Sequence, residues 1–108
     1  MQKILFTYMD EELAIMVTAR LDGKKLVIEG NDFGKKVEEW WGERVYEYSM
    51  ALPEKSVAHL SAVLRLSVNS KGELLETLAQ EYNDNFCFSR LKNLFNQHGI
   101  EYKAECWS

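Results

Sequence analysis

The sequence DFGKKVEEWWGERVYEYSMAL, residues Asp32–Leu52, decides the fold because it changes from one periodicity to another and holds five aromatic side chains. Apolar residues in its first half recur at helical spacing; they are Phe33, Val37, Trp40 and Trp41. We predict that Asn31 or Asp32 caps the start of this helix. Gly42 is predicted to end it, because glycine adopts the left-handed conformation that other residues avoid.

The second half of the same stretch alternates with a period of two, which is typical of a strand. One face holds Tyr46, Tyr48, Met50 and Leu52, and the other holds Val45, Glu47, Ser49 and Ala51. A short helix is therefore predicted beside a strand, with a large aromatic load between them. Because consecutive helical residues diverge by about 100°, we expect one of the two adjacent tryptophans in the core and the other at least partly exposed.

Three strands are predicted before this stretch, over residues 2–9, 12–21 and 24–29. The Asp22-Gly23 step between the second and the third is a strong hairpin signal, because Asp-Gly suits a two-residue turn. Such a turn sets Ala19 opposite Leu26 and places the apolar sides of both strands on one face. Turn chemistry and hydrophobic pattern agree on this pairing.

Three helices and a last strand are predicted after the stretch. Pro53 suits the first position of a helix, because its missing N–H would have no partner there. Ser70 and Glu73 form a capping box before the second helix, and Gly99 ends the third. Residues 100–107 alternate as a final strand. We predict one α+β domain, residues 1–108, in the order β-β-β-α-β-α-α-α-β, with helices packed on one face of a mostly antiparallel sheet of about five strands.

Charge and hydropathy argue against several classes of protein. The chain has 17 acidic and 13 basic side chains, a net charge of −4, and the excess lies in residues 1–54, which hold 11 acidic and seven basic groups. Phosphate binding needs clustered Lys and Arg, so nucleic acid is not expected as a partner, whereas a basic protein is compatible. No apolar segment approaches the ~20 residues of a membrane span and no secretory signal is recognisable, so a cytoplasmic location is expected.

The sequence shows no recognisable motif for catalysis, metal binding or a cofactor. His59 lies on a predicted helix, with no adjacent group to make it a general base. Cys87 lies near a helix start with Arg90 close by, the setting of a reactive thiol. No histidine is placed to activate it, so we expect a buried, inert thiol, and we expect Cys106 in the core of the last strand. We therefore predict no catalytic residue, no metal site and no cofactor.

The predicted partner-binding residues surround the double tryptophan. Exposed tryptophans are frequent at protein-binding hot spots, and acidic side chains follow and precede this pair in the sequence. The candidate set is Glu38, Glu39, Trp41, Glu43 and Glu47. An apolar centre ringed by carboxylates would suit a partner that presents Arg or Lys around an apolar patch.

The second half of the chain resembles a group of small bacterial toxin-immunity proteins. The resemblance is carried by YEYSMALPEKSV, by LLETLAQEYN and by FSRLKNLFNQHGIEYKAECWS, over residues 46–57, 74–83 and 88–108. It implies a non-enzymatic protein that binds and neutralises a cognate toxin, often a basic nuclease. The matching residues are caps, helix stops and strand residues, so the resemblance assigns no binding residue.

Two other functions remain open from the sequence. The acidic side chains could imitate the phosphates of a nucleic acid, as in an inhibitor made by a mobile element, and binding would then collapse with added salt. Alternatively, a pocket between sheet and helices near Cys87 or His59 could make the chain a small ligand-binding or enzyme domain.

Overall fold

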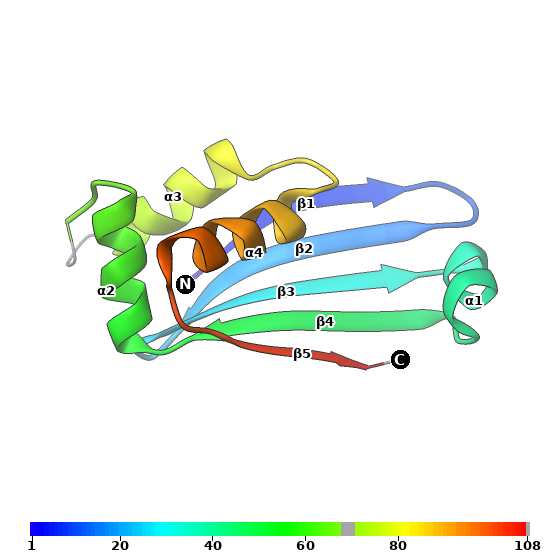
Figure 1. Cartoon of the computed structure of the whole chain (residues 1–108). Helices are drawn as coiled ribbons and strands as arrows, with labels where there is room; N and C mark the ends of the chain where they lie inside the picture. Colours follow the sequence, from blue (N-terminus) through cyan, green and yellow to red (C-terminus); the bar gives the residue numbers. More distant parts are fainter. Residues whose placement is uncertain (68–70, 108) are drawn as a thin grey trace.

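In the computed structural model, residues 1–67 and 71–107 are described, and five strands within them form one sheet in the order β1-β2-β3-β4-β5 (Figure 1). The strands are β1 (Gln2–Met9), β2 (Ala14–Asp22), β3 (Lys25–Phe33), β4 (Val45–Leu52) and β5 (Lys103–Trp107). Every neighbouring pair is antiparallel. The α+β class and the predicted five-stranded antiparallel sheet are confirmed.

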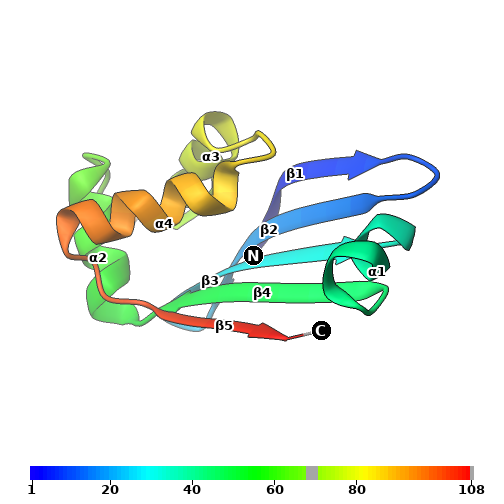
Figure 2. The ribbon, with the colours of Figure 1, turned by 45° about the vertical axis from the view of Figure 1, so that its right-hand side comes forward.

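The described helices follow the predicted element order. They are α1 (Lys35–Trp41), α2 (Glu54–Val63), α3 (Lys71–Glu81) and α4 (Cys87–His98). The last three gather on one face towards one end of the sheet, while α1 stands alone at the opposite end (Figures 1 and 2). The predicted Ser70 cap of α3 lies outside the described residues.

The β2–β3 hairpin has the predicted faces and a different register. Asp22 pairs with Lys25, so the turn is Gly23-Lys24, with Gly23 at φ 64°, and not Asp22-Gly23. Ala19 consequently lies opposite Ile28, whereas Leu26 was predicted there. Because side chains alternate with a period of two, a shift of two residues leaves the same residues on the same face.

Strand β3 is longer than predicted, and this removes the predicted helix caps. Its pairing with β2 and β4 runs to Phe33, so Asp32 lies in the sheet and α1 begins after Gly34. Gly34 has φ 120°, and a Cβ there would lie 2.4 Å from the carbonyl oxygen of Glu12. The chain therefore turns from sheet to helix at a residue that must be glycine. Gly42 ends α1 in the left-handed conformation, as predicted.

The core lies between the sheet and the helices α2, α3 and α4. The largest fully buried side chains there are Phe95, Leu26, Ile28, Met50, Leu52, Leu60, Leu74, Leu75, Leu78 and Leu91. Each such side chain stabilises the fold by roughly 1.5–3 kcal/mol relative to an exposed one. The core therefore joins the first half of the chain to the second through this one layer.

The helical layer is shorter than the sheet, and this gives the molecule its two ends. A nine-residue strand spans about 30 Å, whereas the 12 residues of α4 span about 18 Å. The molecule measures 42 × 25 × 22 Å. We call residues 7–16 and 31–48, which include α1, the α1 end, and we call the remainder the helical end.

Candidate binding surface at the α1 end

Large apolar side chains are exposed mainly at the α1 end. Ten such side chains are exposed among the described residues, and seven of them belong to this end. The seven are Tyr8, Met9, Met16, Phe33, Trp40, Trp41 and Val45. Single exposed apolar residues are ordinary on a protein surface, whereas a concentration at one end is typical of an interaction site.

Both tryptophans of α1 are exposed, Trp40 by 58% and Trp41 by 53%. The prediction that one of them lies in the core is wrong. Helix α1 has seven residues and buries Val37 alone, and it lies at the end of the sheet away from α2, α3 and α4 (Figure 2). Trp41 nevertheless has a partner, because its ring stacks on Tyr46 with centroids 4.5 Å apart and planes 14° apart.

The sheet face away from the helices carries an apolar row at the α1 end. Strand pairing places Met9 beside Ala14, Ala14 beside Phe33, and Phe33 beside Val45. Met9, Ala14 and Phe33, together with Met16, line a hollow of about 460 Å³. No charged side chain lines it, so it offers contact to apolar groups.

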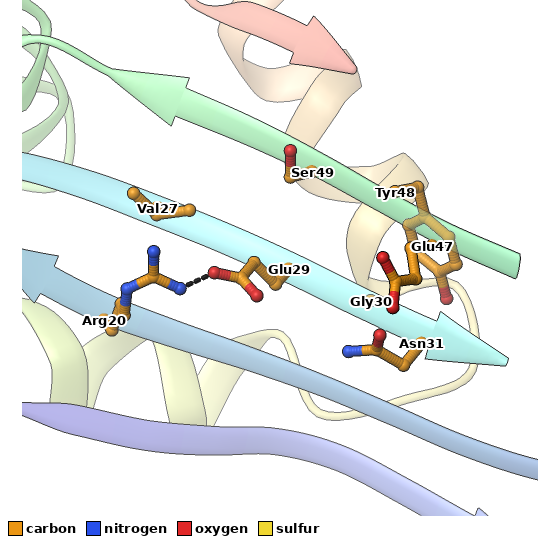
Figure 3. Close-up of a pocket in the computed structure, with 8 residues that line it drawn as sticks. All are labelled: Arg20, Val27, Glu29, Gly30, Asn31, Glu47, Tyr48 and Ser49. Atoms are coloured by element: carbon orange, nitrogen blue, oxygen red, sulfur yellow. Dashed lines mark ion pairs between the residues drawn. The ribbon is translucent and has the colours of Figure 1, made fainter. Parts of the chain in front are cut away.

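The same face is polar further along the sheet. A hollow of about 270 Å³ is lined there by Arg20, Val27, Glu29, Gly30, Asn31, Glu47, Tyr48 and Ser49 (Figure 3). Arg20 and Glu29 form an ion pair across β2 and β3. The two side chains of this ion pair neutralise each other's charge.

The opposite face of the sheet carries a continuous series of aromatic rings, which we call the aromatic row: Trp41, Tyr46 and Tyr48 of the α1 end, and Phe88 of α4. Beyond the stack of Trp41 on Tyr46, the centroids of Tyr46 and Tyr48 lie 5.6 Å apart. Tyr48 meets Phe88 of α4 edge to face at 4.7 Å. The row therefore connects α1 to α4 across β4.

Tyr48 lies flat over Gly30 on the neighbouring strand. A Cβ at Gly30 would lie 1.9 Å from Cε2 of that ring, so only glycine leaves room for it. In this position the Tyr48 hydroxyl donates a hydrogen bond to Oδ1 of Asp32, at 2.9 Å. Burial, followed by the neighbouring Asp32 charge, raises the pKa of Tyr48 far above its ordinary value, so the hydroxyl keeps its proton.

Asp32 is a half-buried carboxylate beside the aromatic row. Burial raises the pKa of Asp32, and the hydrogen bond from Tyr48 opposes that effect. None of the ion pairs within residues 1–67 and 71–107 involves Asp32. On β4, the residue paired with Asp32 is Tyr46. The Asp32 carboxylate and the Trp41–Tyr46 stack are therefore attached at neighbouring backbone positions.

The structure brings four of the five predicted binding residues together. Glu38, Glu39 and Trp41 are exposed on α1, and Glu43 is exposed just after it. Glu38 pairs with Arg44 at 2.8 Å. Glu47 is separate, because it lies on the face of β4 opposite to Tyr46 and lines the polar hollow of Figure 3.

Sequence reasoning missed Asp32, although one signal could have found it. Asn31 or Asp32 was predicted to cap the helix, a role in which an exposed acid is ordinary. Extending the period-two pattern of β3 from Leu26 and Ile28 places residues 30 and 32 on the helix-covered face. An aspartate on the inner face of a strand is uncommon and indicates a specific interaction.

The two cysteines differ from each other. Cys87 is buried, as predicted, and burial raises the pKa of its thiol to about 11. The prediction that Cys106 lies in the core is wrong, because it is exposed. It belongs to the edge strand β5 and lies opposite Tyr48, towards the α1 end, where less of the helical layer covers it.

Within residues 1–67 and 71–107, no three or more His, Cys, Asp or Glu side chains group so that they could hold a metal ion. In the same part of the chain, no helix has both the length and the apolar character needed to cross a membrane. His59 and His98 are exposed on α2 and α4.

No protein-family model, curated protein or solved structure matches the chain. The resemblance to toxin-immunity proteins stays a hypothesis that rests on the residues quoted above. We therefore base the proposed function on the α1 end itself: on its exposed rings, its charges and its position outside the core.

Proposed function

We propose that the protein is a non-catalytic binding module of the toxin-immunity type, which binds a basic partner protein through its α1 end. The observation that carries this proposal is the exposure of both tryptophans on α1, each of which is more than half exposed. A partner that covers these tryptophans would bury apolar surface that the fold leaves exposed, and this burial would stabilise the complex.

The apolar side chains of the α1 end supply the centre of such an interface. Tryptophan and tyrosine are enriched among residues whose removal costs binding most. Trp40 and Trp41 lie on a short helix that packs at the end of the sheet, and Phe33 and Val45 flank that helix in sequence. A partner could therefore contact α1 and the adjacent sheet without any rearrangement of the core.

The charge of the α1 end determines what kind of partner fits. Its residues include eight acidic and three basic side chains, a charge of −5, whereas the remainder has nine acidic and ten basic side chains, a charge of +1. The net charge of the protein thus originates at the end where the apolar side chains are exposed. A basic partner would be steered to this end, and its charges would be matched there.

Co-expression with the product of the adjacent gene tests the proposal. We expect the chain to protect the cell from that product and to bind it directly in calorimetry with the purified proteins. The double variant Trp40→Ala/Trp41→Ala should weaken binding by about 100-fold, as removal of two central anchors does elsewhere. His98→Ala, which removes an exposed ring at the helical end, should leave binding unchanged.

Three outcomes would contradict the proposal: no protection, no direct binding, or equal binding by the double variant and the control. Salt separates the proposal from the nucleic-acid-mimic alternative. A mixed apolar and charged interface should weaken several-fold between 50 and 500 mM salt and persist, whereas a phosphate mimic should lose nearly all binding.

A further inference from the structure

We propose that Asp32 and the aromatic row form a receptor for a single arginine side chain of the partner. This inference rests on the proposed function, and it assigns the partner's chemistry at one point of the interface. The guanidinium would pack against the exposed Trp41 side of the Trp41–Tyr46 stack and donate hydrogen bonds to the Asp32 carboxylate.

Trp41 presents an exposed ring surface to solvent. Trp41 stacks on Tyr46, yet 53% of the tryptophan is still exposed. A stacked ring that remains open to solvent is a platform already held in place, because the contact with Tyr46 fixes its orientation. Guanidinium groups stack on aromatic faces, and the attraction is about 0.5–1 kcal/mol at exposed sites and larger when water is excluded.

The Asp32 carboxylate has no cation paired with it among the described residues. Glu29 is also partly buried in the sheet, and it has Arg20 as its cation. Asp32 has a neutral donor, the Tyr48 hydroxyl, and takes part in no ion pair within residues 1–67 and 71–107. A carboxylate offers about four acceptor positions. Tyr48 uses one of them, so capacity remains for a donor from outside the chain.

Asp32 lies close to the Trp41–Tyr46 stack. Asp32 and Tyr46 are direct partners across β3 and β4, and the Cβ atoms of such pairs lie about 4.5–5.5 Å apart. Trp41 is 4.5 Å beyond Tyr46, centroid to centroid. Asp32 and the Trp41–Tyr46 stack are therefore neighbours at the same end of β3 and β4, which is the arrangement that one arginine needs to contact both.

The flat ring and the carboxylate together favour arginine over lysine. Its planar guanidinium presents five donors in a fixed fork, so one group can stack on a ring and bond a carboxylate simultaneously. An ammonium group has a point charge and holds its water more strongly, which makes it a poorer match to a flat aromatic platform. The net charge of −5 at this end draws either cation towards it.

Titration of the protein with N-acetyl-arginine methylamide, followed by NMR, tests the receptor directly. We expect the indole N–H signal of Trp41 and the backbone signal of Asp32 to shift together, with a dissociation constant in the millimolar range. Asp32→Asn should weaken this binding at least tenfold. Asparagine keeps an acceptor oxygen for the Tyr48 hydroxyl, so the variant should fold, and its amide spectrum verifies that.

Matched ligands and variants make the test specific. The citrulline amide, which is planar and uncharged, should bind at least tenfold more weakly than the arginine amide, and the lysine amide severalfold more weakly. Glu47→Gln removes a charge from the opposite face of β4 and should bind as the unaltered protein does. Equal binding of arginine and citrulline amides, or no loss in Asp32→Asn, would overturn the receptor.

A loss that appears in Glu39→Gln or Glu43→Gln and not in Asp32→Asn would also overturn it, because the cation would then bind on α1. Binding of the partner protein to two variants distinguishes the receptor from the proposed function. If the partner binds, and Trp40→Ala/Trp41→Ala weakens it while Asp32→Asn does not, the receptor fails and the proposed function stands. If no partner binds, the proposed function fails, and the amide titration still decides whether the receptor exists.

Discussion

The two ends of the molecule use the same strands for different purposes. In β3, Leu26 and Ile28 are fully buried, whereas Phe33 at the α1 end is 40% exposed. In β4, Met50 is fully buried and Val45 is exposed. Burial at the helical end therefore supplies most of the stability of the fold, whereas the α1 end leaves large apolar side chains exposed. Changes at the two ends should accordingly separate stability from binding.

The largest expected effect comes from the helical end. Phe95→Ala removes a fully buried aromatic side chain of α4, and the free energy of unfolding should fall by about 3–5 kcal/mol. Phe33→Ala, the matched change at the α1 end, should cost less than about 1.5 kcal/mol because its ring is already partly solvated. Urea unfolding measures both. Equal losses would mean that the two ends contribute alike to the core.

Gly30→Ala tests how tightly the aromatic row is fitted to the sheet. The new Cβ would meet the ring of Tyr48 at 1.9 Å, so the ring must move and its hydrogen bond to Asp32 must break. Overpacking of this kind costs about 1–3 kcal/mol. Gly72→Ala is the control, because a Cβ there has open space within helix α3; it should stabilise by up to about 1 kcal/mol. Thermal unfolding distinguishes the two signs.

A smaller difference should separate the two tryptophans. Trp41→Ala removes the ring that stacks on Tyr46, and aromatic pairs contribute about 0.5–1.5 kcal/mol. Trp40→Ala removes a ring that makes no such stack among the described residues, and exposed substitutions change stability by about 0.5 kcal/mol or less. If Trp40→Ala proved the more destabilising in urea unfolding, the stack would not be what holds α1 to the sheet.

Periodicity was sufficient to predict the fold, because the core residues follow it. The alternation of β4 and the helical spacing of Leu91 and Phe95 reflect the same burial that the structure shows. Register was not predictable, since turns at Asp22-Gly23 and at Gly23-Lys24 bury the same side chains. The length of β3 was missed because a strand end and a helix cap both accept Asn31 and Asp32.

The candidate site was predictable only in part. Consecutive tryptophans and neighbouring glutamates are visible in the sequence, and Glu38, Glu39 and Glu43 do lie on or beside α1. Whether an indole is covered depends on how far the other helices extend over the sheet. The local sequence around the tryptophans does not predict that extent. The position of Asp32 beside Tyr48 likewise depends on pairing between strands that are 16 residues apart in this contact.

Asp32→Asn should have the smallest effect on stability, and its sign is the informative part. Burial raises the pKa of Asp32 in the folded state, so the ionised carboxylate opposes folding at neutral pH. The stability of the unaltered protein should rise as pH falls through that raised pKa towards the unfolded value, because the folded state then binds the extra proton. The asparagine variant lacks this gain.

Asp32→Asn should therefore be slightly more stable at pH 7, by roughly a few tenths of a kcal/mol because solvent screens a half-exposed group, and the advantage should shrink on acidification. Asp84→Asn provides the contrast, since Asp84 pairs with Arg90 at 2.8 Å and should lose stability. Unfolding in urea at several pH values measures both. A destabilised Asp32→Asn would mean that the carboxylate serves the fold. A stabilised variant that no longer binds arginine would mean that the chain keeps this charge for a cation that it does not itself supply.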